Sequence, residues 1–289
     1  MPNQVGTSQV IRFATFEVDL QTQELRKVGL RLKRHATYIY LRSSIAGTVI
    51  LVCCFASFVW AQQAADVTYF ENVRVKPGDV EKYETTLKHH WTWHEKQGEK
   101  WSYFVWTVDS GKNEGAYQIG SFGHTWNEVD ESNALVAGTP GPDEDPEPYQ
   151  LTTEESYFRY RPDLSSGSPT NQPLAVAAVN RILLKPEAAQ DFEVGLRRIK
   201  KVLSGTNGAA ALSAQWYELV TGGDRPQFLL IEERRDWAGF AGAGELDALR
   251  TRIDKSKLPE ETVKSFWGSI RSIYAETWHY RSDLSRLRK

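Results

Sequence analysis

Two histidines inside a long helical pattern are the first residues of this chain that could do chemistry. His90 and His94 lie four residues apart, so a helix places both imidazoles on one face. Such a pair can bind a divalent metal if His124 or a carboxylate supplies a third ligand, and either ring can act as a base. No third ligand and no pocket motif can be identified from the spacing. We therefore expect no metal, haem or other cofactor, and keep His90 and His94 as candidate catalytic residues.

Aromatic residues are concentrated between residues 91 and 126, while the later part of the chain offers fewer at comparable positions. Rings that fill a core are the simpler explanation, but a surplus confined to one part has no packing reason. Trp and Tyr also suit a flat organic ligand, because they join a large apolar surface to a polar atom. If the protein binds a small organic molecule, we expect these ligand-binding residues: Trp91, Trp93, Tyr103, Trp106 and Trp126.

Charge and cysteine content exclude several classes of protein. The chain has 35 basic and 37 acidic residues. Seven of the basic residues and three of the acidic residues precede residue 62, so the part after residue 61 carries a net negative charge. A protein that neutralises phosphates needs a basic face, so nucleic acid is not an expected partner. Cys53 and Cys54 are the only cysteines, which excludes a disulfide framework after residue 61. The sequence also shows no Ser/His/Asp set, phosphate-binding loop or carboxylate dyad.

The region from 66 to 285 contains two similar stretches of sequence. Residues 157–165 match residues 277–285, with identical Tyr, Arg, Asp, Leu and Ser at five positions. Residues 73–88 parallel residues 182–197 at a constant offset, and Trp126 and Trp237 fall at similar places. We therefore predict two repeats, at 66–165 and 174–285, joined by a Ser- and Pro-rich linker. In each, the paired Arg161/Asp163 and Arg281/Asp283 are expected to form a structural contact.

Each repeat has the pattern of a β-α-β-β-α-β unit. The first starts with alternating residues at 67–76, continues with a helical pattern after Pro77, and then has two aromatic-rich strands around a glycine-containing turn. The second repeats this order. One such unit leaves a face of its sheet bare, so we predict an α+β fold in which two ferredoxin-like repeats pack as an intramolecular α/β barrel.

This organisation resembles the dimeric α/β-barrel superfamily, which includes cofactor-independent monooxygenases of antibiotic biosynthesis, haem-degrading enzymes, chlorite dismutase-like proteins and binding proteins. The resemblance spans residues 66–285 and rests on topology and the repeat, without a matched catalytic motif. It implies a site between the sheet and the helices of a unit. It also leaves two function classes open: a small-molecule-binding or scaffold module, and a cofactor-independent monooxygenase acting on an aromatic or quinone-like substrate.

The apolar run from 45 to 60 predicts export of everything after it. It holds no charge, follows basic residues, and ends in Val59-Trp60-Ala61, which suits a signal peptidase. We interpret residues 36–61 as a signal peptide, or as a membrane anchor if cleavage does not occur, which would make residues 45–60 the sole membrane contact. The expected location is periplasmic or secreted, in the cell envelope.

The first 35 residues have a character of their own. Residues 10–34 alternate like short antiparallel strands, and the run from Arg12 to Gly29 resembles the opening β-hairpins of the winged-helix DNA-binding domain of response regulators. In that family three helices follow, whereas here the chain enters the apolar run. A truncated remnant is the favoured interpretation, and a membrane-anchored winged-helix transcriptional regulator is the third and weakest function class.

Overall fold

The computed structural model describes the strands between residues 10 and 31 and, in the larger part, residues 64–137, 141, 145–166, 173–204, 214–242, 244, 246–247, 250 and 258–288. The chain divides into two units, Met1–Phe58 and Val59–Lys289. The signal-like run lies outside the described residues. Among those described, no helix is long and apolar enough to cross a membrane.

The first unit contains a small antiparallel sheet. Its four strands pair in sequence order, and the prediction of short antiparallel strands here is confirmed: β1 (Val10–Phe13), β2 (Phe16–Asp19), β3 (Glu24–Lys27) and β4 (Leu30–Arg31).

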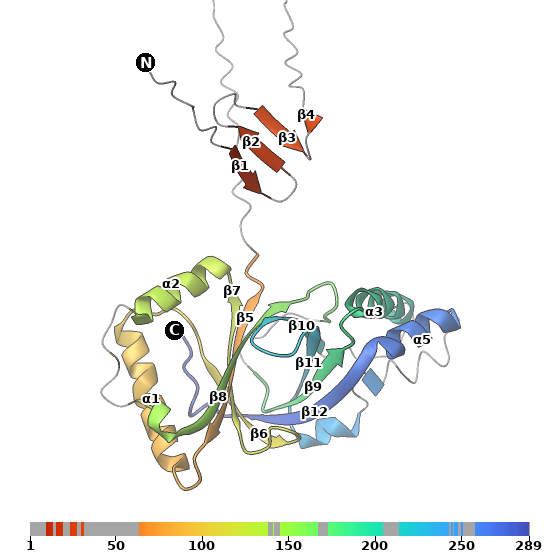
Figure 1. The fold of residues 1–289 in the computed structure, drawn as a ribbon. Helices are drawn as coiled ribbons and strands as arrows, with labels where there is room; N and C mark the ends of the chain where they lie inside the picture. The colour runs from red at the N-terminus through yellow and green to blue at the C-terminus, as the bar shows by residue number, and fades with distance from the viewer. Residues whose placement is uncertain are drawn as a thin grey trace, which may run out of the picture. The chain divides into compact units, whose positions relative to one another are not determined.

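The second unit is built around a closed eight-stranded barrel (Figure 1). Its first half has β5 (Val67–Val75), α1 (Val80–Lys96), β6 (Phe104–Ser110), β7 (Tyr117–His124), α2 (Trp126–Ala137), a short helix η1 (Glu147–Tyr149) and β8 (Gln150–Tyr160). Its second half has β9 (Val176–Leu184), α3 (Ala189–Ser204), β10 (Ala214–Thr221), β11 (Gln227–Arg234), η2 (Trp237–Ala241), α5 (Glu260–Ser269) and β12 (Ile270–Tyr280). The α+β barrel expected from the sequence is therefore present.

The barrel closes because the edge strands of each half pair with edge strands of the other half. The order around the barrel is β10-β11-β9-β12-β6-β7-β5-β8, with β8 pairing β10 and β12 pairing β6, all antiparallel. The pairing leaves no strand of the barrel with a free edge. The helices α1 and α2 cover the outside of the first half, and α3 and α5 cover the second (Figure 1).

Three separate apolar cores follow from the alternation of side chains along the strands. Inward-facing rings such as Phe70, Phe158 and Trp278 fill the barrel. Outward-facing residues of each half meet that half's helices, in one core around Tyr83 and Leu87 and in another around Phe192 and Trp216. The candidate site lies in the first of these outer cores.

The segments that follow β8 and β12 cross to the opposite half. Leu164 is buried in the outer core of the second half, and Leu284 is buried in that of the first. Arg161 binds Asp163 through two hydrogen bonds of 3.0 and 2.9 Å and also reaches Glu193 on α3 at 2.7 Å. The expected Arg161–Asp163 contact is thus confirmed, and it clamps the exchanged segment.

The same arrangement recurs at the end of the second half. Arg281 binds Asp283 at 2.8 Å and Glu84 on α1 at 2.8 and 3.0 Å. These hydrogen bonds confirm the Arg281–Asp283 contact and attach the tail of the second half to the first helix of the first.

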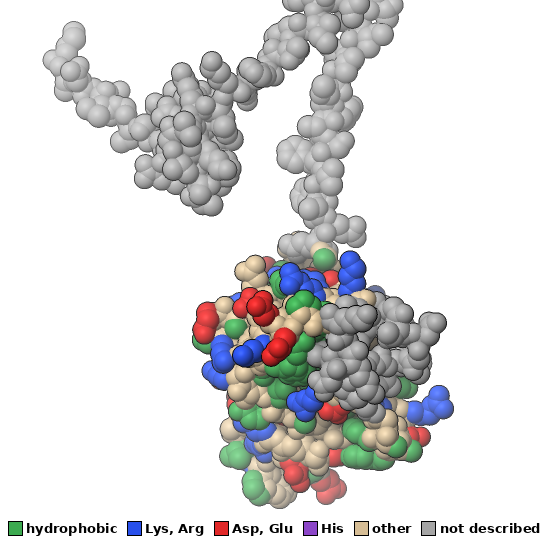
Figure 2. Space-filling model, turned by 90° about the vertical axis from the view of Figure 1, so that its right-hand side faces the viewer, with side chains coloured by type: hydrophobic (Ala, Val, Ile, Leu, Met, Phe, Trp, Pro, Cys, Tyr) green, Lys and Arg blue, Asp and Glu red, His purple; other side chains and the backbone are tan. Residues whose placement is uncertain are grey.

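Basic and acidic side chains are interspersed on the face of the protein shown in Figure 2, rather than gathered into a basic surface. This face therefore lacks the continuous basic surface that binding to a nucleic-acid backbone requires.

Candidate functional site

A cavity of about 380 Å³ lies between the sheet of the first half and the helices α1 and α2. Its volume falls in the range of small-molecule sites. Six aromatic residues line it: Tyr69, Tyr83, Trp91, Trp101, Tyr103 and Tyr157. The outward positions of β5 and β8 and the inner face of α1 bring these rings together, because outward strand residues and one helical stripe face the same space.

His90, His94 and Glu99 form a connected chain of polar groups in the wall of this cavity. The Nε2 atoms of His90 and His94 are 2.8 Å apart, and Nδ1 of His94 lies 2.5 Å from Oε2 of Glu99. The helical spacing of four sets the first contact, and the turn after α1 returns Glu99 to the second. His90 Nδ1 is buried and makes no hydrogen bond within the described residues, so the chain ends in an unused ring nitrogen.

Glu99 is held as a carboxylate by its neighbours. Burial alone would raise its pKa, but the close contact with His94 and the hydrogen bonds from Ser132 and Tyr103 outweigh burial and hold the pKa below its usual value. The hydroxyls of Ser132 and Tyr103 donate at 2.6 and 2.8 Å, and Arg286 lies 3.7 Å away. A negative Glu99 favours a proton on Nδ1 of His94, which leaves Nε2 of His94 free to accept from His90.

His90 is neutral at physiological pH. Burial, followed by the neighbouring His94, lowers its pKa to about 4. With its Nε2 proton directed at His94, Nδ1 of His90 carries a lone pair that has no hydrogen-bond partner among the described residues. The arrangement can therefore accept a proton from a ligand and pass positive charge toward Glu99.

A second polar group stands on the sheet side of the cavity. Burial, with a contribution from the adjacent carboxylate of Glu155, raises the pKa of Glu71 to about 7. Glu71 and Glu155 are direct cross-strand partners, and the hydroxyl of Tyr69 donates to Glu71 at 3.2 Å. Near neutral pH this carboxyl exists in both protonation states, so it can donate or accept a hydrogen bond.

Tyr83 adds an unsatisfied polar atom to the same cavity. Its side chain is fully buried, and its hydroxyl has no hydrogen-bond partner within the described residues. A buried hydroxyl without a partner costs free energy, so natural proteins keep few of them. The hydroxyl of Tyr83 and Nδ1 of His90 are thus two polar atoms beside the cavity without a hydrogen-bond partner among the described residues.

The tryptophans and tyrosine expected at a site are not all in one place. Trp91 and Tyr103 line the cavity and stack on each other at 4.7 Å. Trp93 is half-buried with its ring 4.8 Å from that of His94, and Trp126 packs with its ring 5.8 Å from that of Tyr157. Neither is among the residues that line the cavity.

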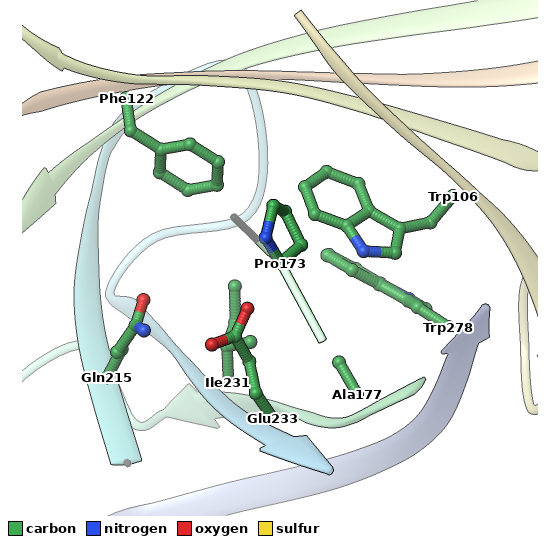
Figure 3. Close-up of a pocket in the computed structure, with 8 residues that line it drawn as sticks. All are labelled: Trp106, Phe122, Pro173, Ala177, Gln215, Ile231, Glu233 and Trp278. Carbon is green, nitrogen blue, oxygen red and sulfur yellow. The ribbon is translucent and has the colours of Figure 1, made fainter. Parts of the chain in front are cut away.

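Trp106 lies elsewhere, because it points into the barrel. It borders a separate pocket of about 10 Å³, with Phe122, Trp278 and Pro173 beside it (Figure 3). Such a volume holds about one water. Glu233 stands at the edge of this pocket, and burial raises its pKa to about 7. As a barrel-facing residue, Trp106 cannot take part in a site on the helix side of the sheet.

His124, the candidate third ligand of a metal, does not join His90 and His94 in the structure. His124 donates or accepts a hydrogen bond with Ser121 at 2.7 Å and stacks on Trp101 at 3.8 Å, away from the paired histidines. No group of three metal-ligating side chains occurs in the part of the chain that the structure describes. The histidines bind each other instead.

No protein-family model matches the sequence, and no curated protein is detectably similar to it. Among solved structures, an anthrone oxidase-like protein is 9% identical with a TM-score of 0.48, covering 77% of this chain and 94% of its own. A chlorite dismutase from Candidatus Nitrospira defluvii is 11% identical with a TM-score of 0.46, and the match covers 77% of this chain and 94% of that protein. A heme-binding protein from Thermus thermophilus is 8% identical with a TM-score of 0.42, and the match covers 75% of this chain and 92% of that protein. These values are low, so the barrel assignment rests on the strand pairing itself.

The superfamily that the sequence resembles includes haem-degrading enzymes, but the described residues of the two outer cores do not fit a haem. In the second half, Phe192, Trp216 and Phe266 fill the space between sheet and helices and are fully buried. In the first half, no Lys or Arg is found among the described residues that line the cavity, although haem propionates need cationic partners. Glu71 and Glu155 stand there instead.

Sequence reasoning missed Glu99, Glu71 and Tyr83. Glu71 carried a usable signal, because it interrupts the apolar outward positions of a strand that must pack under helices. Glu99 follows the helix in a turn, and its return to His94 could not be inferred from spacing. The hydroxyl of Tyr83 sits at a core position of α1, where a ring without a hydroxyl was equally suited.

Proposed function

We propose that the first-half cavity binds a small aromatic molecule and that His90 removes a proton from it. The observation that carries this proposal is the unused Nδ1 of His90, buried in the cavity wall at the end of the chain to His94 and Glu99. A lone histidine whose pKa is near 4 is a weak base. The contact with His94 provides an onward path for the proton, because an imidazolium on His94 lies beside the carboxylate of Glu99.

The proposed transfer moves two protons in sequence. Nδ1 of His90 accepts a proton from the ligand, and Nε2 of His90 gives its own proton to Nε2 of His94. The positive charge then lies on His94, 2.5 Å from Glu99. His94 and Glu99 are both buried, so the electrostatic interaction between them is stronger than in solvent.

The reaction class that this base serves best is oxygenation without a cofactor. A flat substrate with an activated CH₂ group, of the anthrone type, becomes electron-rich once it is deprotonated and can react directly with dioxygen. One oxygen atom becomes a carbonyl on the former CH₂ carbon, and the other leaves as water with the two hydrogens. The substrate supplies the electrons, so the balance requires no further reductant.

The second candidate is a binding or scaffold module without catalysis. The polar atoms of the cavity also suit a small-molecule sensor, and the apolar run from 45 to 60 favours a place in the cell envelope for residues 62–289. Deletion of residues 1–61 should then give a soluble protein, whereas the full chain should be exported. Retention of the full chain in the cytosol would exclude the envelope role.

The catalytic proposal is tested with a panel of flat phenols, anthrones and hydroquinones. Binding is read from quenching of tryptophan fluorescence, since Trp91 and Trp101 line the cavity, and turnover is read from oxygen consumption. His90→Ala should abolish turnover and weaken binding by about tenfold, equivalent to one lost hydrogen bond. His89→Ala is the matched control, because His89 is exposed and outside the cavity.

The outcomes separate the two candidates. Binding without oxygen uptake, unchanged by His90→Ala, would leave the binding module as the survivor. Absence of binding by the whole panel would exclude a ligand site in this cavity for these compounds.

A further inference from the structure

The charged side chains that line the first-half cavity are acidic among the residues that the structure describes. Four of these residues carry a carboxyl group: Glu71, Glu99, Asp145 and Glu155. Among the described residues that line it, none is a lysine or arginine, and the nearest guanidinium to Glu99, that of Arg286, lies outside the lining. His90 is neutral. The cavity therefore presents a negative potential to any molecule that enters it.

Aromatic rings make up most of the remaining wall. Tyr69 and Tyr157 lie 5.4 Å apart, Tyr69 and Trp101 lie 6.3 Å apart, and Trp101 and Tyr103 lie 6.2 Å apart, so the rings form a continuous surface. Faces of Trp and Tyr attract organic cations through their quadrupoles, most strongly where water is excluded. A wall of rings closed by carboxylates is the combination that recognises a positively charged organic group.

Two groups in this wall lack the partner that such a guest would supply. Glu71 holds its proton up to about pH 7 because it is buried beside Glu155, and no lysine or arginine is among the described residues that line the cavity. The fully buried hydroxyl of Tyr83 has no partner within the described residues and can accept a hydrogen bond from an ammonium group. A hydrogen-bond donor that carries positive charge would therefore interact favourably with both the carboxyl group of Glu71 and the hydroxyl of Tyr83.

We infer that the ligand of this cavity is an aromatic molecule bearing a protonated amine or another organic cation. The inference rests on the proposed function and names its substrate class: the ring lies among the tyrosines and tryptophans within reach of His90, and the cationic group lies toward Glu71, Glu155 and Tyr83. The groups that face Glu71 are Tyr69 on its own strand, Glu155 on β8 and Tyr83 on α1. Binding of a cation there returns Glu71 to its carboxylate form and releases its proton.

Three phenols that differ only in the charge of the side chain provide the test: tyramine, 4-ethylphenol and 4-hydroxyphenylacetate. Calorimetric titration of residues 62–289 at pH 7 should give tyramine the highest affinity, about tenfold above the neutral compound, and the anion the lowest. Titration in two buffers with different ionisation enthalpies counts the protons released. Tyramine should release about half a proton, because a group whose pKa is near 7 is half protonated at that pH.

Two variants fix the origin of the effect. Glu71→Gln should remove the proton release and lower the preference for tyramine, whereas Glu154→Gln, at the barrel end outside this cavity, should leave both unchanged. Equal affinity for all three phenols, or tightest binding of the anion, would overturn the charge inference while the cavity remains a ligand site. Failure of all three to bind would overturn the proposed function together with it.

Discussion

The two halves of the barrel pack the same kind of helix against the same kind of sheet, but their described residues differ in how they occupy the space between. In the second half, Phe192 is stacked on Phe266 at 5.1 Å, and Ile199 is fully buried beside them. In the first half, the positions of Phe192 and Ile199 are taken by Tyr83 and His90, and a cavity of about 380 Å³ remains. A packed aromatic core and a polar cavity can thus occupy equivalent places in one architecture.

The strands repeat the same contrast. Val67–Val75 and Val176–Leu184 have equal length, and aligning them places Glu71 opposite Asn180 and Tyr69 opposite Ala178. The hydrogen-bonded bridges of Tyr103 and Ala214 are likewise equivalent. At each place the first half has the larger or more polar residue, although its space is the emptier one. Packing alone gives no reason for that choice.

Separating the halves should have the largest effect. Residues 62–165 alone lack Leu284, which is buried in their outer core, and expose β6 and β8, whose partners are β12 and β10. We expect an aggregated or self-paired species, measured by light scattering. A stable monomer of this half would contradict the dependence of each half on the other.

Large-to-small substitutions at equivalent helix positions come next. Phe192→Ala should lower the free energy of unfolding by about 3–5 kcal/mol, because it opens a cavity in a filled core. Tyr83→Ala should cost roughly half as much, because it enlarges an existing cavity and removes an unsatisfied hydroxyl. Urea denaturation of both variants measures the difference. Equal losses would show that the first half is packed as tightly as the second.

Glu71→Gln should have a smaller and pH-dependent effect. Unfolded glutamate loses its proton near pH 4.5, whereas folded Glu71 keeps it to about pH 7. The folded state therefore binds more protons between these values, and stability falls as the pH rises through them. Glu71→Gln should raise the free energy of unfolding at pH 8 by as much as about 3 kcal/mol and leave it unchanged at pH 4. Thermal denaturation at both pH values, with Glu154→Gln as the control, checks the sign.

Tyr83→Phe should produce the smallest change, and its sign is informative. Removal of a buried hydroxyl without a partner should stabilise the empty protein by about 1 kcal/mol. The same substitution should weaken tyramine binding if that hydroxyl accepts from the ligand. A loss of stability would mean that the hydroxyl already has a partner in solution, such as a water.

The sequence indicated the architecture better than it indicated the site. Strand alternation and Pro77 predicted the order of elements, because these signals are local. The position of Trp106 could not be inferred, because one residue of register decides between the barrel interior and the helix side. The chain from His90 to Glu99 depends on the path of a turn, and the raised pKa of Glu71 depends on burial under helices that are distant in sequence. Both features depend on tertiary structure, so the local sequence pattern does not reveal them.

The exchanged tails have a consequence for the order in which the protein can mature. Arg286 donates to the backbone oxygens of Glu99 and Trp101 at 2.8 and 3.0 Å, and Trp91 donates to that of Leu284 at 2.7 Å. The turn that carries Glu99 is therefore fastened by residues that a ribosome adds almost two hundred positions later. The half that emerges first must wait for Leu284 and Arg286 before its cavity is complete. The second half, by contrast, obtains Leu164 before its own strands are made.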